Sequence, residues 1–236
     1  AEPKGAARAR VVLCVHGGGF VGGSIYTHRK LFGHLAKRAG IRALLFDYSL
    51  VPKAFPTQLE ETVAAYRWLL DQGIEHIAFA GDSAGGGLII SAQLRARELG
   101  LPMPAAALPF SPWLDMELSG ETYETNRDVD VFADREMVRG LVELYLGEGD
   151  RRDPLANALY GELTGIAPLY VQVGGEEVLL DDARRLVERA SAAGVEARLD
   201  VFPGMQHTFQ MAAGRAPEAD DAIGRMAAWV RPLLGL

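Results

Sequence analysis

The chain has 236 residues, of which 49% are hydrophobic and 23% are charged, a composition typical of a globular protein with one large core or two small ones. Its formal net charge of −7 argues against nucleic acid or an anionic membrane surface as the main partner, because both would need clustered cations. No apolar stretch approaches the ~20 residues that span a bilayer, so stable membrane insertion is not expected.

The single cysteine, Cys14, rules out an internal disulfide and a zinc site of the cysteine type. It lies in the apolar run 11–15, which favours a buried and unreactive thiol. No signal peptide is recognisable, so a cytoplasmic location is expected.

Six short apolar runs predict buried strands, and helical patterns lie between them. The strands are expected at 11–15, 43–46, 77–80, 105–110, 169–173 and 197–202. The helices are expected at 27–39, 57–70, 84–99, 134–146, 181–193 and 217–234. This alternation predicts an α/β fold in which helices cover both faces of a parallel sheet.

Residues 111–167 interrupt the alternation after the fourth strand. Ligands of such sheets bind beyond the carboxyl ends of the strands, so we expect this excursion to contribute to a pocket wall. Trp113, at its start, and Phe20 are candidate pocket residues, and a position in the core is an equally good interpretation of such large aromatic side chains.

The stretch Gly81-Asp82-Ser83-Ala84-Gly85 matches the pattern G-x-S-x-G, with a predicted strand before it and a predicted helix after it. In this context the pattern indicates a nucleophile elbow, a strained turn that exposes the serine hydroxyl. Side chains at the two glycine positions would collide with the neighbouring strand and helix. We therefore predict Ser83 as a nucleophile, and a glycine-rich helix start without chemistry is the alternative.

A second glycine-rich loop, HGGGF at 16–20, follows the first strand. Its amides can point at the oxygen of a carbonyl under attack, so Gly18 and Gly19 are predicted oxyanion-hole donors, with the amide of Ala84 completing the hole. The loop lacks the spacing and the lysine of phosphate-binding loops. Asp47, which ends the second strand, is expected to bind backbone amides near this loop and brace it.

A serine nucleophile needs a base, and that base needs a third group to hold its tautomer. Of five histidines, His207 alone lies in a loop after the last predicted strand, where its ring would reach the carboxyl edge of the sheet. The others have different settings: His16 in the glycine-rich loop, His28 and His34 in a predicted surface helix, and His76 at a strand start. His207 is the predicted base.

Four acidic residues follow the fifth strand: Glu176, Glu177, Asp181 and Asp182. Asp181 and Asp182 are expected to serve as the N-cap and a first-turn acid of the next helix. One glutamate should face the site and the other solvent, and position alone does not choose between them. The chain order of serine, acid and histidine is that of α/β-hydrolases.

From about residue 10 to its end, the chain resembles the hormone-sensitive-lipase family of α/β-hydrolases, the bacterial esterases with an HGGG loop. The matching motifs are HGGGF at 16–20, DYSLVP at 47–52, GDSAGG at 81–86, SPWLD at 111–115 and GMQHTF at 204–209. The family's acid stands in a D-P-L-x-D-E pattern that aligns with EVLLDD at 177–182, so the resemblance selects Glu177. Glutamate replaces the usual aspartate, as in some members.

Two departures from the family stand out. Gly87 occupies a position where many members carry asparagine, beyond the catalytic turn. Members also carry a helical cap and two opening strands before the HGGG loop, whereas only fifteen residues precede His16. We therefore expect one catalytic domain, 1–236, with an α/β-hydrolase fold, a mostly parallel sheet and no such cap or first strands.

The resemblance implies a serine carboxylesterase that hydrolyses short- to medium-chain esters through an acyl-enzyme, without a metal or organic cofactor. Hydrolysis of lactones or amides by the same three residues is the alternative. A small-molecule receptor without catalysis is a further one, since related plant proteins bind a hormone on this scaffold, although they lack the base. The only partner expected is the small-molecule ester, and a homodimer is left open.

Overall fold

Six strands form a single sheet in the computed structural model, which describes residues 1–236. The strands are β1 (Ala7–Val15), β2 (Ile41–Leu45), β3 (His76–Asp82), β4 (Ala106–Phe110), β5 (Leu169–Gly174) and β6 (Ala197–Phe202). Their order is β2-β1-β3-β4-β5-β6, and all neighbours are parallel. The strand order reverses between β1 and β3, and ligands bind at such a switch point, beyond the carboxyl ends.

Seven α-helices connect the strands or lie between them. They are α1 (Ile25–Ala39), α2 (Thr57–Asp71), α3 (Ala84–Glu98), α4 (Thr122–Thr125), α5 (Arg135–Leu146), α6 (Leu180–Ala192) and α7 (Pro217–Leu233). Two 3-10 turns, Ala158–Tyr160 and Phe209–Ala212, complete the set. All six predicted strands and all six predicted helices are present, with boundaries shifted by a few residues, so the predicted fold class is confirmed.

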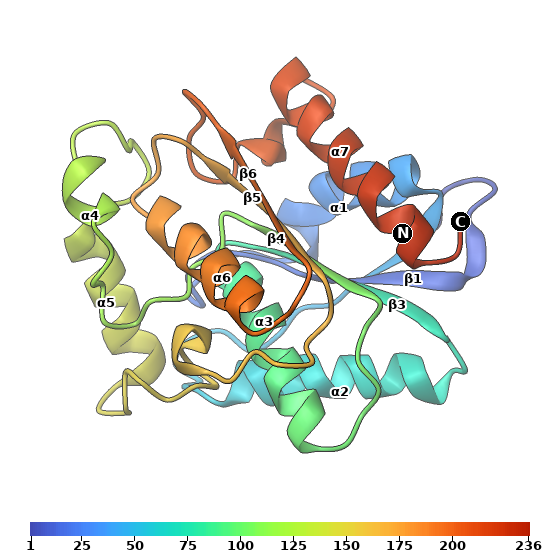
Figure 1. The fold of residues 1–236 in the computed structure, drawn as a ribbon, viewed down its shortest axis with the longest axis horizontal. Coiled ribbons are helices and arrows are strands. Elements are labelled where there is room, and N and C mark those ends of the chain that lie inside the picture. Colours follow the sequence, from blue (N-terminus) through green and yellow to red (C-terminus); the bar gives the residue numbers. More distant parts are fainter.

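The sheet separates two hydrophobic cores, because successive side chains of a strand point to opposite faces. In β1, Val11 and Leu13 belong to the core beneath α2, α3 and α6, whereas Val12 and Cys14 belong to the core beneath α1 and α7. Figure 1 shows these two groups of helices on opposite sides of the sheet. Cys14 is buried, as predicted, and burial raises the pKa of its thiol.

Local signals in the sequence explain why α1 begins and ends where it does. The Ser24 side chain accepts a hydrogen bond from the Thr27 amide, and the Thr27 hydroxyl accepts one from the Ser24 amide, which forms a capping box. Gly40 ends the helix in a left-handed conformation with φ of 72°. In this helix, the ring centroid of His28 lies 5.5 Å from that of His16, in the loop that follows β1.

The excursion between β4 and β5 carries α4 and α5, which lie together at one end of the sheet (Figure 1). Tyr145 of α5 stacks on Phe20 of the glycine-rich loop, with ring centroids 3.8 Å apart. From the α4 region, Asn126 donates a hydrogen bond to the backbone oxygen of Glu177. The excursion therefore contacts segments from both sides of the predicted site, and its role as a pocket wall stays a prediction.

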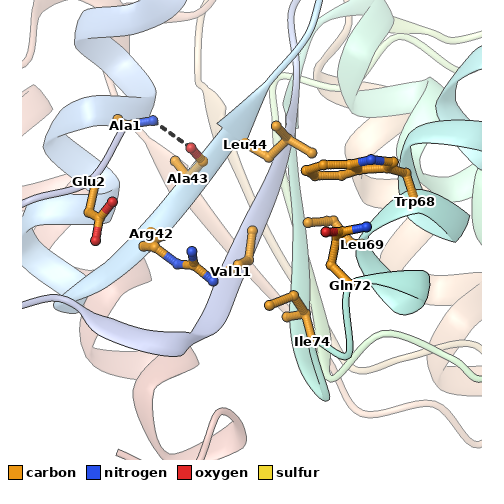
Figure 2. Close-up of a pocket in the computed structure, with 10 residues that line it drawn as sticks. All are labelled: Ala1, Glu2, Val11, Arg42, Ala43, Leu44, Trp68, Leu69, Gln72 and Ile74. Atoms are coloured by element: carbon orange, nitrogen blue, oxygen red, sulfur yellow. Dashed lines mark hydrogen bonds between the residues drawn. The ribbon is translucent and has the colours of Figure 1, made fainter.

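A pocket of about 440 Å³ lies at the outer edge of the sheet, between β2 and the end of α2. Figure 2 shows Arg42 and Trp68 at its two sides and Ala1 hydrogen-bonded to Ala43. None of the residues predicted for the active site lines this pocket. No helix of the structure has both the length and the apolarity that crossing a bilayer demands.

Candidate active site

Ser83 stands at the turn between β3 and α3, with φ of 52° and ψ of −121°. A Cβ at Gly81 would lie 2.3 Å from the backbone oxygen of Gly85, and one at Gly85 would lie 2.2 Å from that of Val15. Backbone packs against the turn on both sides, so only glycine fits at these two positions. The structure therefore confirms that side chains at Gly81 and Gly85 would collide with neighbouring backbone. The turn holds Ser83 in a strained conformation.

Gly85→Ala is expected to destabilise the fold. The new Cβ would meet backbone atoms that cannot rotate away, so the free energy of unfolding should fall by at least about 1–3 kcal/mol. Gly33→Ala in α1 is the matched control, because its Cβ would meet nothing within 4 Å and alanine favours a helix by up to about 1 kcal/mol. Urea unfolding measures both, and equal stability of the two variants would contradict this packing.

The structure brings Ser83, His207 and Glu177 into one hydrogen-bonded chain. The Nε2 atom of His207 lies 2.9 Å from Ser83 Oγ, and its Nδ1 atom lies 2.8 Å from Glu177 Oε2. The three residues come from the ends of β3, β5 and β6, at the carboxyl edge of the sheet. With Nδ1 donating to the carboxylate, Nε2 is free to accept the proton of the serine hydroxyl.

Two adjacent glutamates, which sequence position does not separate, have different surroundings. Glu177 is fully buried, and its Oε1 atom accepts hydrogen bonds from Ser111 Oγ at 2.6 Å and from the Gly174 amide at 2.5 Å. Glu176 is partly exposed, and its carboxylate accepts a hydrogen bond from Gln206 at 2.8 Å. Only Glu177 contacts the ring of His207.

Ser111 is a part of the site that appears in the sequence analysis only as the first residue of the SPWLD motif, without a role. It is fully buried in a left-handed conformation with φ of 44°, and its hydroxyl donates to Glu177. The same oxygen accepts a hydrogen bond from the amide of Thr208, at 3.1 Å, next to the predicted base. Its position directly after β4 was the available signal, because active-site residues gather at strand ends.

The structure corrects the predicted N-cap of α6 and confirms Asp182 as an acidic residue of its first turn. Leu179 is the N-cap of α6, without a side-chain hydrogen bond, so neither aspartate caps the helix. Asp182 lies in the first turn but is fully buried, and it accepts hydrogen bonds from the amides of Leu114 and Asp115. Burial and the nearby charge of Asp115 raise the pKa of Asp182 to about 7.

Two amides of the glycine-rich loop, those of Gly18 and Gly19, have no acceptor within the protein. Gly18 and Gly19 have φ of 119° and 59°, values that favour glycine, and a Cβ at Gly18 would lie 2.4 Å from the backbone oxygen of Gly22. Neither amide donates a hydrogen bond within the protein. Ala84 opens α3, where the first amides of a helix have no intrahelical acceptor. None of the three predicted oxyanion-hole amides is engaged by an acceptor within the protein, and their role as donors stays a prediction.

Aromatic rings support this loop from below. His16 is buried, stacks on Tyr48 with centroids 4.2 Å apart, and accepts on its backbone oxygen a hydrogen bond from the Tyr48 hydroxyl. Phe20 and Trp113 are both buried and lie 5.8 Å apart, so each is a core residue. The Asp47 carboxylate accepts a hydrogen bond from the backbone amide of Ile25, at the start of α1, and its Oδ1 atom lies 4.0 Å from Nε2 of His16 in the glycine-rich loop.

His28 does not lie on a surface helix face as predicted. It is only 7% exposed, and its Nε2 atom lies 3.1 Å from a carboxylate oxygen of Asp82. Asp82 also accepts a hydrogen bond from the amide of Gly17.

The structure contains no group of three or more His, Cys, Asp or Glu side chains placed to hold a metal ion.

Comparison with known proteins gives a consistent picture. A family model described as the alpha/beta hydrolase fold matches residues 12–211. An acetyl-hydrolase of Streptomyces hygroscopicus is 40% identical over 229 residues, which cover 96% of this chain and 77% of that protein. An esterase of Acinetobacter venetianus is 33% identical, and the match covers 97% of this chain and 77% of that protein.

Solved structures agree with these relatives. A crystal structure of an esterase from the bacterial hormone-sensitive lipase family has a TM-score of 0.96 and 48% identity, covering 98% of this chain and 79% of that one. A hormone-sensitive lipase from a metagenome library has a TM-score of 0.93 and 41% identity, covering 97% and 79%. The chain belongs to the hormone-sensitive-lipase family of α/β-hydrolases.

Proposed function

We propose that this ester hydrolase uses Ser83 as its nucleophile, His207 as its general base and Glu177 as the acid that orients the base. The observation that carries the assignment is the unbroken hydrogen-bonded chain from Ser83 Oγ through both ring nitrogens of His207 to Glu177. A serine hydroxyl becomes a useful nucleophile when a base is in hydrogen-bond reach and a third group holds that base.

In the first half of the reaction, Ser83 Oγ attacks the ester carbonyl carbon while its proton moves to Nε2 of His207. The carbonyl oxygen becomes an oxyanion and accepts hydrogen bonds from the amides of Gly18, Gly19 and Ala84. When the tetrahedral intermediate collapses, His207 gives its proton to the leaving alcohol and the acyl group stays on Ser83. Water, deprotonated by the same ring, then attacks the acyl-enzyme and releases the carboxylic acid.

The proposed substrates are esters of short- to medium-chain acids. Two relatives support this range by their names, the acetyl-hydrolase and an ethyl acetate hydrolase of Pseudomonas putida that is 30% identical.

Hydrolysis of p-nitrophenyl esters from acetate to laurate tests the proposal. We expect kcat/KM to be highest for short or medium chains and to fall towards laurate. Undiminished kcat/KM at laurate would contradict the substrate range, and a folded chain inactive on every ester would contradict ester hydrolysis itself. A lactone and an anilide of matched acyl length distinguish esterase activity from the related activities that the same three residues could perform.

The pH dependence should follow the proposed base. Burial lowers the pKa of His207, but the charge and hydrogen bond of Glu177 outweigh burial, so its pKa lies above the ordinary value of 6.5. The ring must be neutral to accept a proton, so kcat/KM should increase as the pH rises through this raised pKa. At pH values below the pKa the ring is protonated and kcat/KM should be low. A pH–rate profile with its inflection below 6.5 would contradict this expectation.

The cellular location and the oligomeric state of the protein are also proposals. We propose a cytoplasmic location, and fractionation of the native cells tests it. The net charge of −7 supports the absence of a nucleic-acid partner. A monomer or a homodimer is equally compatible with the proposed mechanism, and light scattering distinguishes them.

A further inference from the structure

A second pair of a histidine and a carboxylate, His28 and Asp82, lies next to the proposed active site. His28 Nε2 and Asp82 Oδ2 are 3.1 Å apart, and the two side chains are 9% and 3% exposed. The other oxygen of Asp82 accepts a hydrogen bond from the amide of Gly17 at 3.1 Å. Asp82 immediately precedes Ser83, and Gly17 immediately precedes the amides of Gly18 and Gly19. One carboxylate therefore joins the nucleophile's turn to the oxyanion loop.

The surroundings of His28 suit a proton on both ring nitrogens. Its Nδ1 atom lies 2.7 Å from the Thr27 hydroxyl oxygen, which also lies 2.9 Å from the backbone oxygen of Ser24. When the hydroxyl donates to Ser24, it accepts a hydrogen bond from the ring. Its Nε2 atom faces Asp82, which only accepts. Burial lowers the pKa of His28, but the hydrogen bond and the charge of Asp82 outweigh it and raise the pKa.

The neighbouring ring of His16, with its centroid 5.5 Å from that of His28, does not share this charge. Burial lowers the pKa of His16, which favours its neutral ring. A protonated His28 would be the cation that balances the buried carboxylate of Asp82. A buried carboxylate without a partner would be costly, because its desolvation is not compensated.

The contact between Asp82 and Gly17 is close enough to set the position of the loop. A Cβ at Gly17 would lie 2.5 Å from Asp82 Oδ2, so the carboxylate occupies the place where a side chain would stand. The negative charge of Asp82 also acts on the proposed base. Burial lowers the pKa of His207, whereas the charge and hydrogen bond of Glu177 raise it and the charge of Asp82 raises it further. An unbalanced Asp82 would likewise oppose a developing oxyanion.

We propose that protonated His28 is a positioning residue for the reaction: it holds Asp82, which fixes the amides of Gly18 and Gly19 relative to Ser83, and it neutralises Asp82. The inference rests on the proposed function, because it assumes that those amides bind the oxyanion. His28 should therefore stabilise the transition state, in which the carbonyl oxygen is charged, and should leave the binding of the neutral ester unchanged.

His28→Gln tests the proposal, with steady-state kinetics on p-nitrophenyl acetate. We expect kcat per active site to fall by roughly 10- to 100-fold, at or below the loss typical of one missing oxyanion donor. KM should change little, since an interaction made mainly in the transition state affects kcat. His34→Gln, the same change in the same helix, is the matched control and should leave kcat and KM unchanged. Active-site titration corrects both variants for any misfolded fraction.

A trifluoromethyl ketone provides a readout that a purely structural role would not move. Its carbonyl carbon bonds to Ser83 Oγ and its oxygen becomes an oxyanion, so its inhibition constant should rise in His28→Gln by the factor that kcat/KM falls. The double variant His28→Gln with Asp82→Asn should recover part of the lost kcat, because no unbalanced carboxylate remains. This second variant keeps the test valid where His28→Gln alone folds poorly.

The outcomes separate this inference from the proposed function. If Ser83→Ala is inactive while His28→Gln behaves like His34→Gln, the positioning role is overturned and the nucleophile stands. A raised KM with unchanged kcat, or an inhibition constant equal to that of the wild type, also overturns the positioning role. Full activity of Ser83→Ala overturns the proposed function first.

Discussion

Ser83→Ala should lower kcat by roughly 10⁴- to 10⁶-fold, the loss that other serine hydrolases show when their nucleophile is removed. The variant keeps the oxyanion amides and the base but has no oxygen to carry the acyl group. Residual turnover would come from direct attack of water within the site. Initial rates with p-nitrophenyl acetate at high enzyme concentration measure this loss.

The control for this variant is Ser191→Ala, which removes a hydroxyl from an exposed position of α6. It should leave kcat unchanged, and thermal unfolding should show both variants folded. Retention of most activity by Ser83→Ala would contradict the assignment of the nucleophile. A comparable loss in Ser191→Ala would show that the assay reports folding rather than chemistry.

Glu177→Gln should lower kcat by roughly 10⁴-fold, the effect of the corresponding acid-to-amide change in a serine protease triad. The amide cannot hold His207 in the tautomer that leaves Nε2 free, and it no longer stabilises the charged ring. The buried carboxylate of Glu177 also accepts hydrogen bonds from Ser111 and Gly174. In the variant, an NH₂ group replaces one carboxylate oxygen, so one of these donors, or the ring of His207, would face another donor. Steady-state kinetics and unfolding curves measure the two consequences separately.

Glu176→Gln is the matched control, one residue away and identical in chemistry. Its side chain contacts Gln206 and not the ring of His207, so kcat should change by less than about 3-fold, as for a peripheral hydrogen bond. If Glu176→Gln were the more damaging variant, the role of the acid would pass to Glu176. Equal and small effects in both would mean that His207 needs no carboxylate partner.

Much of the fold can be predicted from the sequence because its signals are local. Apolar runs with no polar face mark the strands of a buried parallel sheet, and the helices between them carry their own caps, such as Gly40. Ser83 is recognisable because backbone crowding demands glycine at Gly81 and Gly85. His207 is recognisable because it follows the last strand, where the carboxyl edge of the sheet lies.

The remaining features of the site depend on contacts between distant segments. Whether Glu176 or Glu177 faces inwards depends on how the loop after β5 meets Ser111, which lies 66 residues away in the chain. His28 looks like a surface residue in sequence because its partner Asp82 is 54 residues away. Asp182 lies in the first turn of α6 as predicted, but its burial is not evident from the sequence, since the amides it binds belong to another segment.

The most direct test of the central claim is to identify the residue that carries the covalent intermediate. Diethyl p-nitrophenyl phosphate reacts with an activated serine, which bonds to phosphorus while p-nitrophenolate leaves. We predict one equivalent of p-nitrophenolate per chain, complete loss of esterase activity, and a diethylphosphoryl group on Ser83 by peptide mass spectrometry. Modification of a different residue, or esterase activity that survives stoichiometric labelling of Ser83, would contradict the account.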